Sequence, residues 1–213
     1  EIKDLKRLRF VTSHPKDMKE NLIKLFGNEE KLMPYLHLPI QSGSDKILKK
    51  MNRGHTVQYY LDTISQLKKI RSDIAISGDF IVGFPGETEE DFIKTLNVCE
   101  KIKYSQAYSF KYSPRTGTPS FKMEDISESV KNHRLSKLQD RIHFHQVEFQ
   151  KKLIDTVQEV LIEKVGKFNN QYIGRTPYMN PVVLNSKENL IGEILPVKIL
   201  ASNGLSLSGE CVI

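Results

Sequence analysis

The sequence predicts an α/β fold made of parallel βα units, followed by a small antiparallel β-barrel. Between residues 1 and about 119, short β-type runs alternate with amphipathic segments, which is the order of βα units around a parallel sheet. From residue 157 onward, β-type runs follow one another between Gly and Asn turns. We therefore expect two domains, residues 1–150 and residues 151–213.

Four strands are expected in the first domain, each followed by a turn rich in Gly, Pro or Ser. They cover residues 8–12, 36–40, 74–82 and 107–112. Helices are expected at residues 18–26, 45–51, 57–70 and 89–102. Thr88 followed three residues later by Asp91 resembles a capping arrangement, which fixes the start of the last of these helices.

A long helix and five short strands are expected in the rest of the chain. Residues 127–155 form one charged segment without Gly or Pro, so we expect a helix that connects the two domains. The strands of the barrel are expected at residues 160–165, 172–175, 182–184, 191–200 and 205–212.

Composition and charge narrow the class of protein. The 213 residues are 38% hydrophobic, enough for a buried core, and no window reaches the roughly 18 apolar residues of a membrane helix. We therefore expect a cytoplasmic protein with no membrane partner. A net charge of +6 favours a polyanionic partner. Cys99 and Cys211 lie far apart and form no Cys-x-x-Cys pair, so no metal-ligand cluster is read from them.

Polar or glycine-rich loops follow the four predicted strands, where ligands of parallel sheets and barrels gather. Gly83 and Gly86 allow a backbone to approach a nucleoside closely, and Asp79 and Glu87 can engage ribose hydroxyls or an amino group. Arg115 can hold a carboxylate or phosphate through two contacts. The alternative is structural: loop serines that cap helices, glycines that only shape turns, and an arginine that pairs with a surface acid.

Four strings of residues, in order, resemble the MiaB-type tRNA methylthiotransferases. They are Leu-His-Leu-Pro-Ile-Gln-Ser-Gly-Ser at 36–44, Met-Asn-Arg at 51–53, Asp-Phe-Ile-Val-Gly-Phe-Pro-Gly-Glu-Thr at 79–88 and Tyr-Ser-Pro-Arg-Thr-Gly-Thr-Pro at 112–119. Gly-Arg-Thr at 174–176 and Ser-Leu-Ser-Gly-Glu at 206–210 are similar to the family's TRAM domain, a small RNA-binding β-barrel. The resemblance therefore covers nearly the whole chain.

The resemblance implies a partial radical S-adenosylmethionine (SAM) TIM-like barrel, with four of six βα units, ahead of the TRAM barrel. It implies SAM and two 4Fe-4S clusters in the full-length enzyme, and tRNA, through its anticodon arm, as the partner. The family's cluster cysteines, including a Cys-x-x-x-Cys-x-x-Cys motif, are absent from these 213 residues. Because Glu1 is followed almost at once by a strand-like run, we expect the chain to be truncated. Because the cluster cysteines are absent, we expect it to hold no cluster and to be inactive alone.

The flanking residues at 12–15 and 108–110 are similar to the branch that methylthiolates isopentenylated adenosine next to the anticodon. Sister branches act on threonylcarbamoyl-adenosine or on a ribosomal-protein aspartate. Two other readings stay open: a non-catalytic RNA-binding module, and a phosphate-binding TIM-barrel enzyme, for which no acid, base and nucleophile converge.

The resemblance also implies site residues. Expected SAM contacts are Gln41, Ser42, Gly43, Asp79, Gly83, Gly86 and Arg115. The common pattern Gly-x-Ile-x-Gly-x-x-Glu would place Gly at 79 and Glu at 86, so Asp79 and Gly86 depart from it. Expected RNA contacts are Lys164, Lys167, Tyr172, Arg175 and Lys198. The apolar edge of the first strand should be covered, for example by a second copy in a homodimer.

Overall fold

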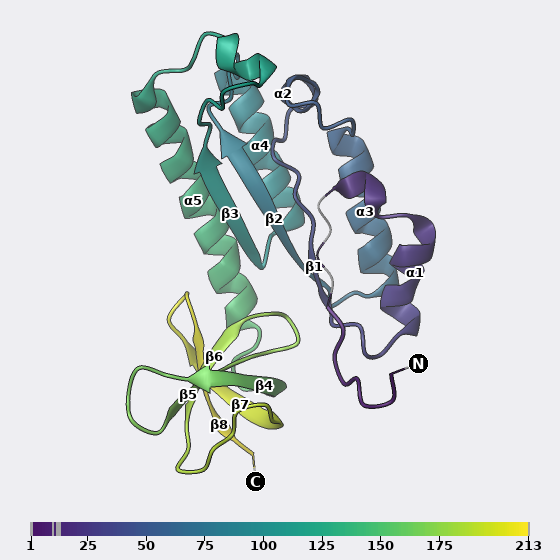
Figure 1. Cartoon of the computed structure of the whole chain (residues 1–213), viewed down its shortest axis with the longest axis vertical. Coiled ribbons are helices and arrows are strands. Elements are labelled where there is room, and N and C mark those ends of the chain that lie inside the picture. The colour runs from purple at the N-terminus through teal and green to yellow at the C-terminus, as the bar shows by residue number, and fades with distance from the viewer. Residues whose placement is uncertain (1, 10, 12–13, 213) are drawn as a thin grey trace.

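The computed structural model describes residues 2–9, 11 and 14–212. A curved parallel sheet covered by helices on one face stands above a closed β-barrel, and one long helix joins them (Figure 1). The predicted α/β class, with βα units followed by a small barrel, is confirmed.

Three parallel strands form the sheet in the order β1-β2-β3, with helices between them. A short 3₁₀ turn, Pro15–Asp17, precedes the first helix. The elements that follow are α1 (Glu20–Asn28), β1 (Tyr35–His37), α2 (Asp45–Lys50), α3 (Val57–Ile70), β2 (Ala75–Val82), α4 (Glu89–Ile102) and β3 (Gln106–Lys111). Even-numbered residues of β2, such as Phe80 and Val82, are buried against the helices in the main core. Odd-numbered residues, such as Asp79, face the other side of the sheet, which we call the open face.

The strand β1 is shorter than the predicted strand 36–40. Pro39 has no N–H to donate to the ladder, and continuous pairing with β2 stops at His37. A single bridge between Gln41 and Phe80 follows, with Gln41 at φ 77°. Proline therefore ends the regular strand and leaves Gln41 in a left-handed turn beside β2.

The predicted strand 8–12 lies beside β1 but forms no continuous ladder among the described residues. Leu8 forms a bridge with Leu32, and Val11 forms one with His37. The two bridges are three residues apart in the first segment and five residues apart in the second. That mismatch prevents a regular register, and residues 10 and 12 of the prediction lie outside the described residues.

A long helix, α5 (Glu128–Lys151), leads from a 3₁₀ turn at Pro119–Lys122 to the barrel. The barrel closes in the order β4-β5-β6-β8-β7. Its strands are β4 (Val157–Val165), β5 (Gln171–Arg175), β6 (Pro181–Asn185), β7 (Ile194–Ser202) and β8 (Leu207–Cys211). The pair β6 and β8 is parallel, which departs from the expectation of an entirely antiparallel barrel. The other four pairs are antiparallel, and an odd number of strands in a closed ring leaves one neighbouring pair that runs in the same direction.

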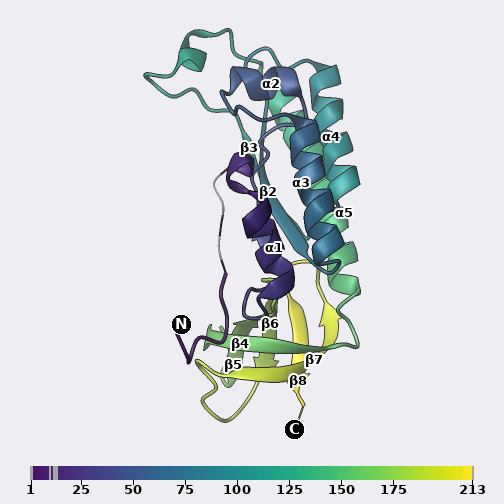
Figure 2. The ribbon, with the colours of Figure 1, turned by 90° about the vertical axis from the view of Figure 1, so that its right-hand side faces the viewer.

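The barrel lies at the amino ends of the sheet strands, and the predicted ligand loops lie at the opposite, carboxyl ends (Figure 2). Arg7 donates from Nη2 to the Glu159 carbonyl at 2.7 Å, and the Tyr178 hydroxyl donates to Asp73 Oδ2 at 2.9 Å. These contacts join the barrel to the start of the chain and to the turn before β2. No helix in the described part of the chain is long and apolar enough to cross a membrane.

Candidate functional site

The loop after β1 is fastened to α4. The Ser44 hydroxyl donates to Asp91 Oδ1 at 2.7 Å, and the Gly43 N–H donates to Thr95 Oγ1 at 2.9 Å. A Cβ at residue 43 would lie 2.5 Å from the backbone of α4, so only glycine fits this approach. Ser42 is fully buried. Ser44 caps α2, as the structural alternative expects, and Ser42 and Gly43 face the protein.

The loop after β2 is held by a buried ion pair. Glu87 Oε2 accepts from the Gly83 N–H at 2.7 Å and pairs with Arg134 Nη1 of α5 at 2.8 Å. Burial raises the pKa of the Glu87 carboxyl, and the Gly83 N–H and Arg134 oppose that rise. Glu87 Oε2 is therefore used within the protein, whereas Oε1 is buried without a hydrogen-bond partner among the described residues, and the expectation that Glu87 engages a ribose or an amino group stays a prediction.

Gly83 and Gly86 adopt φ values of 72° and 79°, which favour glycine. A Cβ at Gly83 would collide with the Lys131 side chain, and one at Gly86 with the Lys50 side chain. The tight turn and close packing within the protein account for both glycines.

Four of the expected SAM contacts are accessible, and Gly86 is one of them. The backbones of Gln41 and Asp79 are adjacent, since the Gln41 N–H donates to the Asp79 carbonyl at 2.9 Å, and the Asp79 side chain lies on the open face. Arg115 is exposed in the loop after β3. His37 bridges Ser77 Oγ at 3.0 Å and Asp79 Oδ2 at 3.3 Å, so the carboxylate is oriented. An oriented carboxylate beside an amide has the chemistry to contact the hydroxyls or amino group of a nucleoside.

The two cysteines of the chain lie far apart, in α4 and in β8. In the ranges that the structure describes, no three His, Cys, Asp or Glu side chains are grouped to hold a metal. Cys99 is buried, and burial raises the pKa of its thiol to about 12. Cys211 lies in the distant barrel and is partly buried.

The expected RNA contacts on the barrel divide into two groups. Lys164 and Lys198 are exposed, and Lys167 is exposed with its ammonium 5.9 Å from the Phe168 ring centre. Arg175 is used internally, with Nη1 donating to the Met179 carbonyl at 2.9 Å and Nε 3.3 Å from Glu163. Tyr172 packs against the barrel core.

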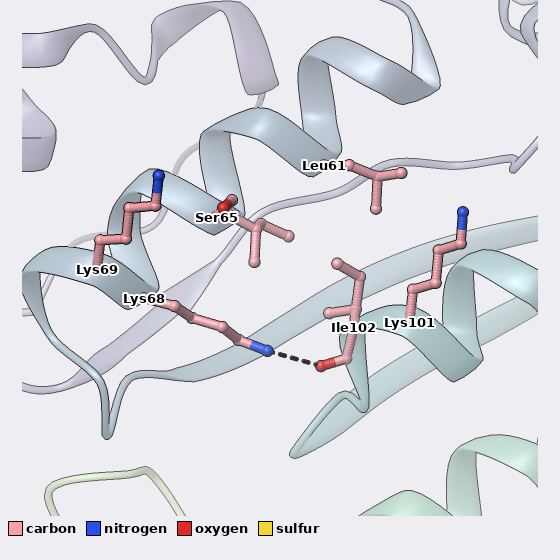
Figure 3. A pocket seen from close by; sticks show the side chains of 7 residues that line it. Leu61, Ser65, Lys68, Lys69, Lys101 and Ile102 are labelled. Atoms are coloured by element: carbon pink, nitrogen blue, oxygen red, sulfur yellow. Dashed lines mark hydrogen bonds between the residues drawn. The ribbon is translucent and has the colours of Figure 1, made fainter.

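A separate hollow lies on the helical layer, away from the open face, between α3 and α4. Figure 3 shows Lys68, Lys69 and Lys101 around it, with Lys68 Nζ donating to the Ile102 carbonyl at 3.1 Å. Burial lowers the pKa of Lys68, as do the nearby charges of Lys103 and Lys152. The positive charges of these lysines favour an anion at this surface.

The residues that sequence reasoning missed come from α5. Arg134 holds the loop after β2, which we call the glycine loop, through its ion pair with Glu87, and the Lys131 side chain packs against Gly83 of the same loop. Arg134 lies 47 residues beyond Glu87 in the sequence. Both residues lie in a segment whose many charged residues are typical of a solvent-exposed helix, so nothing in the neighbouring sequence indicated that these two would be buried. Such a contact is visible only once α5 packs beside β3.

Two family models match the chain. The Radical SAM superfamily model matches residues 1–99, and the TRAM domain model matches residues 151–212. Curated relatives named tRNA-2-methylthio-N(6)-dimethylallyladenosine synthase match almost the whole chain. The protein from Orientia tsutsugamushi (strain Boryong) is 54% identical over 211 residues, with 98% of this chain and 47% of that protein covered. The protein from Rickettsia rickettsii (strain Sheila Smith) is 51% identical, with 99% and 48% covered.

The chain thus spans about half the length of the curated relatives it matches. Among solved structures, the radical SAM enzyme coproporphyrinogen III oxidase (HemN) from Escherichia coli superposes with a TM-score of 0.53 at 12% identity. That match covers 80% of this chain and 46% of HemN. At this identity, the likeness concerns the fold alone.

Proposed function

The chain belongs to the MiaB-type family of tRNA methylthiotransferases, and from this we propose that it serves an enzyme that methylthiolates carbon 2 of N6-isopentenyladenosine next to the tRNA anticodon. The observation that carries the proposal is the identity of 50–54% to curated synthases of this name, over nearly all of the chain and so across both the radical SAM segment and the TRAM barrel. The acceptor named for these relatives is a dimethylallyladenosine, which favours this branch over the one acting on threonylcarbamoyl-adenosine.

We propose SAM and two 4Fe-4S clusters as cofactors of the whole enzyme, where they supply the radical, the sulfur and the methyl group. The part of SAM binding assigned to this chain rests on Gln41, Asp79, Gly86 and Arg115, which are accessible. Ser42, Gly43 and Gly83 are buried and shape the loops behind them. Since the family's cluster cysteines are absent from these 213 residues, we expect the chain alone to be inactive.

The proposed RNA partner is the anticodon arm of tRNA, in contact with the TRAM barrel through Lys164, Lys167 and Lys198. Exposed lysines neutralise phosphates without reading sequence. If the chain acts alone, the same surface would make it a non-catalytic RNA-binding module. The homodimer through the predicted first strand, residues 8–12, also stays a proposal, supported by the 71% exposure of Val11 beside β1.

A chimera tests the activity. The matching half of the Rickettsia rickettsii relative is replaced by this chain, and the product is reconstituted anaerobically with iron, sulfide, SAM and isopentenylated tRNA. We expect methylthiolated isopentenyladenosine in nucleoside mass spectrometry, and none from the 213-residue chain alone. A parallel reaction contains tRNA with threonylcarbamoyl-adenosine, and modification of that nucleoside instead would assign the sister branch. An inactive chimera that holds both clusters would contradict the proposal.

A further inference from the structure

Two aromatic rings of β3 lie exposed on the open face of the sheet, beside side chains of β2. In this parallel pair, Tyr108 lies opposite Asp79 and Phe110 lies opposite Ile81. Paired residues of neighbouring strands point to the same side of a sheet, so these four side chains share the open face. Tyr108 is 48% exposed and Phe110 is 54% exposed. The open face therefore has a polar part at Asp79 and an apolar part at Phe110 and Ile81.

The Tyr108 ring belongs to the polar part of the face. Gln106 Nε2 donates to its hydroxyl at 2.7 Å. The His37 ring, which also contacts Asp79, meets the Tyr108 ring edge-on at 6.3 Å between centres. Phe110 follows two residues later in the strand, and its side chain carries no polar atom. It therefore offers a ligand an accessible ring that binds through apolar contact or stacking.

A small apolar cluster supports the apolar part of the face. Ile47, Phe84 and Tyr112 are buried in it, and Ile81 packs against it while remaining partly exposed. The Phe84 and Tyr112 rings meet at 4.9 Å between centres, edge to face. This packing restrains the Ile81 side chain next to Phe110, so little conformational entropy is lost when an apolar group covers both.

The apolar part adjoins a residue proposed to contact SAM. Asp79 and Ile81 are two residues apart in β2, which is roughly 7 Å along the strand. A nucleoside whose apolar substituent rests on Phe110 and Ile81 therefore has its base close to the proposed cofactor site. The curated relatives are named for a dimethylallyladenosine, and its branched alkenyl substituent is such an apolar group.

We propose that Phe110, with Ile81 beside it, is a specificity-determining residue that receives the dimethylallyl group of the acceptor adenosine. The inference rests on the function proposed above and names the part of the chain that contacts the substituent. Contact between this group and the ring removes apolar surface of both from water. The threonylcarbamoyl group of the sister substrate carries a carboxylate, which loses hydration against apolar side chains and is repelled by the negative face of an aromatic ring.

The test compares anticodon stem-loop RNAs that differ only at the adenosine next to the anticodon, which is unmodified, dimethylallylated or threonylcarbamoylated. Fluorescence anisotropy with the 213-residue chain gives the affinity for each RNA. We expect the dimethylallyl RNA to bind about ten-fold more tightly than the unmodified RNA, a ratio that burial of about two methylene groups gives. Phe110→Thr removes the ring and keeps a side chain that suits a strand, so the two affinities should become equal.

Phe144→Ala is the matched control, because Phe144 is 55% exposed on α5 in the helical layer, and this variant should keep the ten-fold ratio. Phe110→Leu retains a smaller apolar side chain and should leave a ratio of about three-fold. If Phe110→Thr loses its thermal unfolding transition, Phe110→Leu decides, and a ratio that it leaves unchanged would overturn the inference.

The outcomes separate this inference from the proposed function. Wild-type chain that binds none of the RNAs at low salt would overturn both the RNA partner and the role of Phe110. Equal wild-type affinity for the unmodified and dimethylallyl RNAs, or a ten-fold ratio that survives in Phe110→Thr, would overturn the role of Phe110 alone, since the chimera reports the proposed activity through its product. Tightest wild-type binding of the threonylcarbamoyl RNA would also overturn it.

Discussion

At the scale of single residues, Asp91 links two loops of the candidate site. Its carboxylate accepts from the Ser44 hydroxyl at 2.7 Å, from Lys46 Nζ at 2.9 Å and from the Thr88 N–H and hydroxyl. It therefore completes the capping box of α4 and fixes the loop before α2 at the same time. Burial raises the pKa of Asp91, but the bonds from Lys46, Ser44 and Thr88 outweigh it, so the pKa lies far below its ordinary range.

We predict that Asp91→Asn lowers the free energy of unfolding at pH 7 by about 2 kcal/mol, since hydrogen bonds to a buried charge are lost. A lowered folded-state pKa stabilises above the unfolded value, about 3.9, and this contribution disappears as the pH falls further. The difference between variant and wild type should therefore shrink as the pH falls below about 4. Urea unfolding across pH measures it. Glu90→Gln is the control, an exposed neighbour that pairs with Lys94, and a pH-independent difference would contradict the prediction.

The buried pair of Glu87 and Arg134 allows a second prediction. Arg134→Met should cost about 3 kcal/mol, because it leaves a carboxylate buried without its partner. Glu87→Gln combined with Arg134→Met should recover much of that loss. Because burial then raises the Glu87 pKa further, the single variant should be relatively more stable near pH 4 than at pH 7.

Urea unfolding of both single variants and the double variant gives the coupling energy directly. Arg141→Met is the matched control: Arg141 pairs with Glu100 but is 47% exposed, so we expect less than about 1 kcal/mol. Additive losses in the double variant would show that the two side chains do not act as a pair.

At the scale of elements, the sequence predicts those whose signals are local. The predicted residues 57–70 and 89–102 agree with α3 and α4, because Thr56 and Thr88 cap their first turns. The strand at 8–12 could not be judged locally, because its register depends on the spacing of Leu32 and His37 in another segment. In the site, the glycines and serines of the sequence predicted where the loops lie. The burial of the Glu87 side chain could not be predicted, because it depends on the ion pair with Arg134 of α5.

The docking of the barrel onto the sheet depends on few contacts, and Tyr178 makes one of them. Burial and the nearby Asp73 raise the pKa of Tyr178 to about 12, so the hydroxyl donates at all ordinary pH values. We predict that Tyr178→Phe costs about 1 kcal/mol and speeds amide hydrogen exchange on both sides of this junction. Tyr172→Phe is the control, because this ring in the same barrel packs against the barrel core, and it should leave exchange unchanged. Equal effects of the two variants would argue against a docking role.

At the scale of the whole molecule, a net charge of +6 predicts RNA binding that weakens steeply with salt. We expect Lys164→Ala combined with Lys198→Ala to reduce the slope of log affinity against log salt by about two, since each contact releases close to one counterion. Lys69→Ala combined with Lys101→Ala removes the same charge from the helical layer. If the two double variants weaken binding equally, net charge rather than the barrel surface directs the RNA.

The barrel lies at the amino ends of the strands, so the length of the strands sets the distance between the barrel and the glycine loop at their carboxyl ends. The eight residues of β2 at about 3.3 Å each separate the barrel junction from the glycine loop by roughly 26 Å. A stacked nucleotide advances about 3.4 Å along its strand, so an RNA must extend over about eight stacked nucleotides to touch both ends. An RNA shorter than this span should therefore contact either the barrel or the glycine loop, but not both.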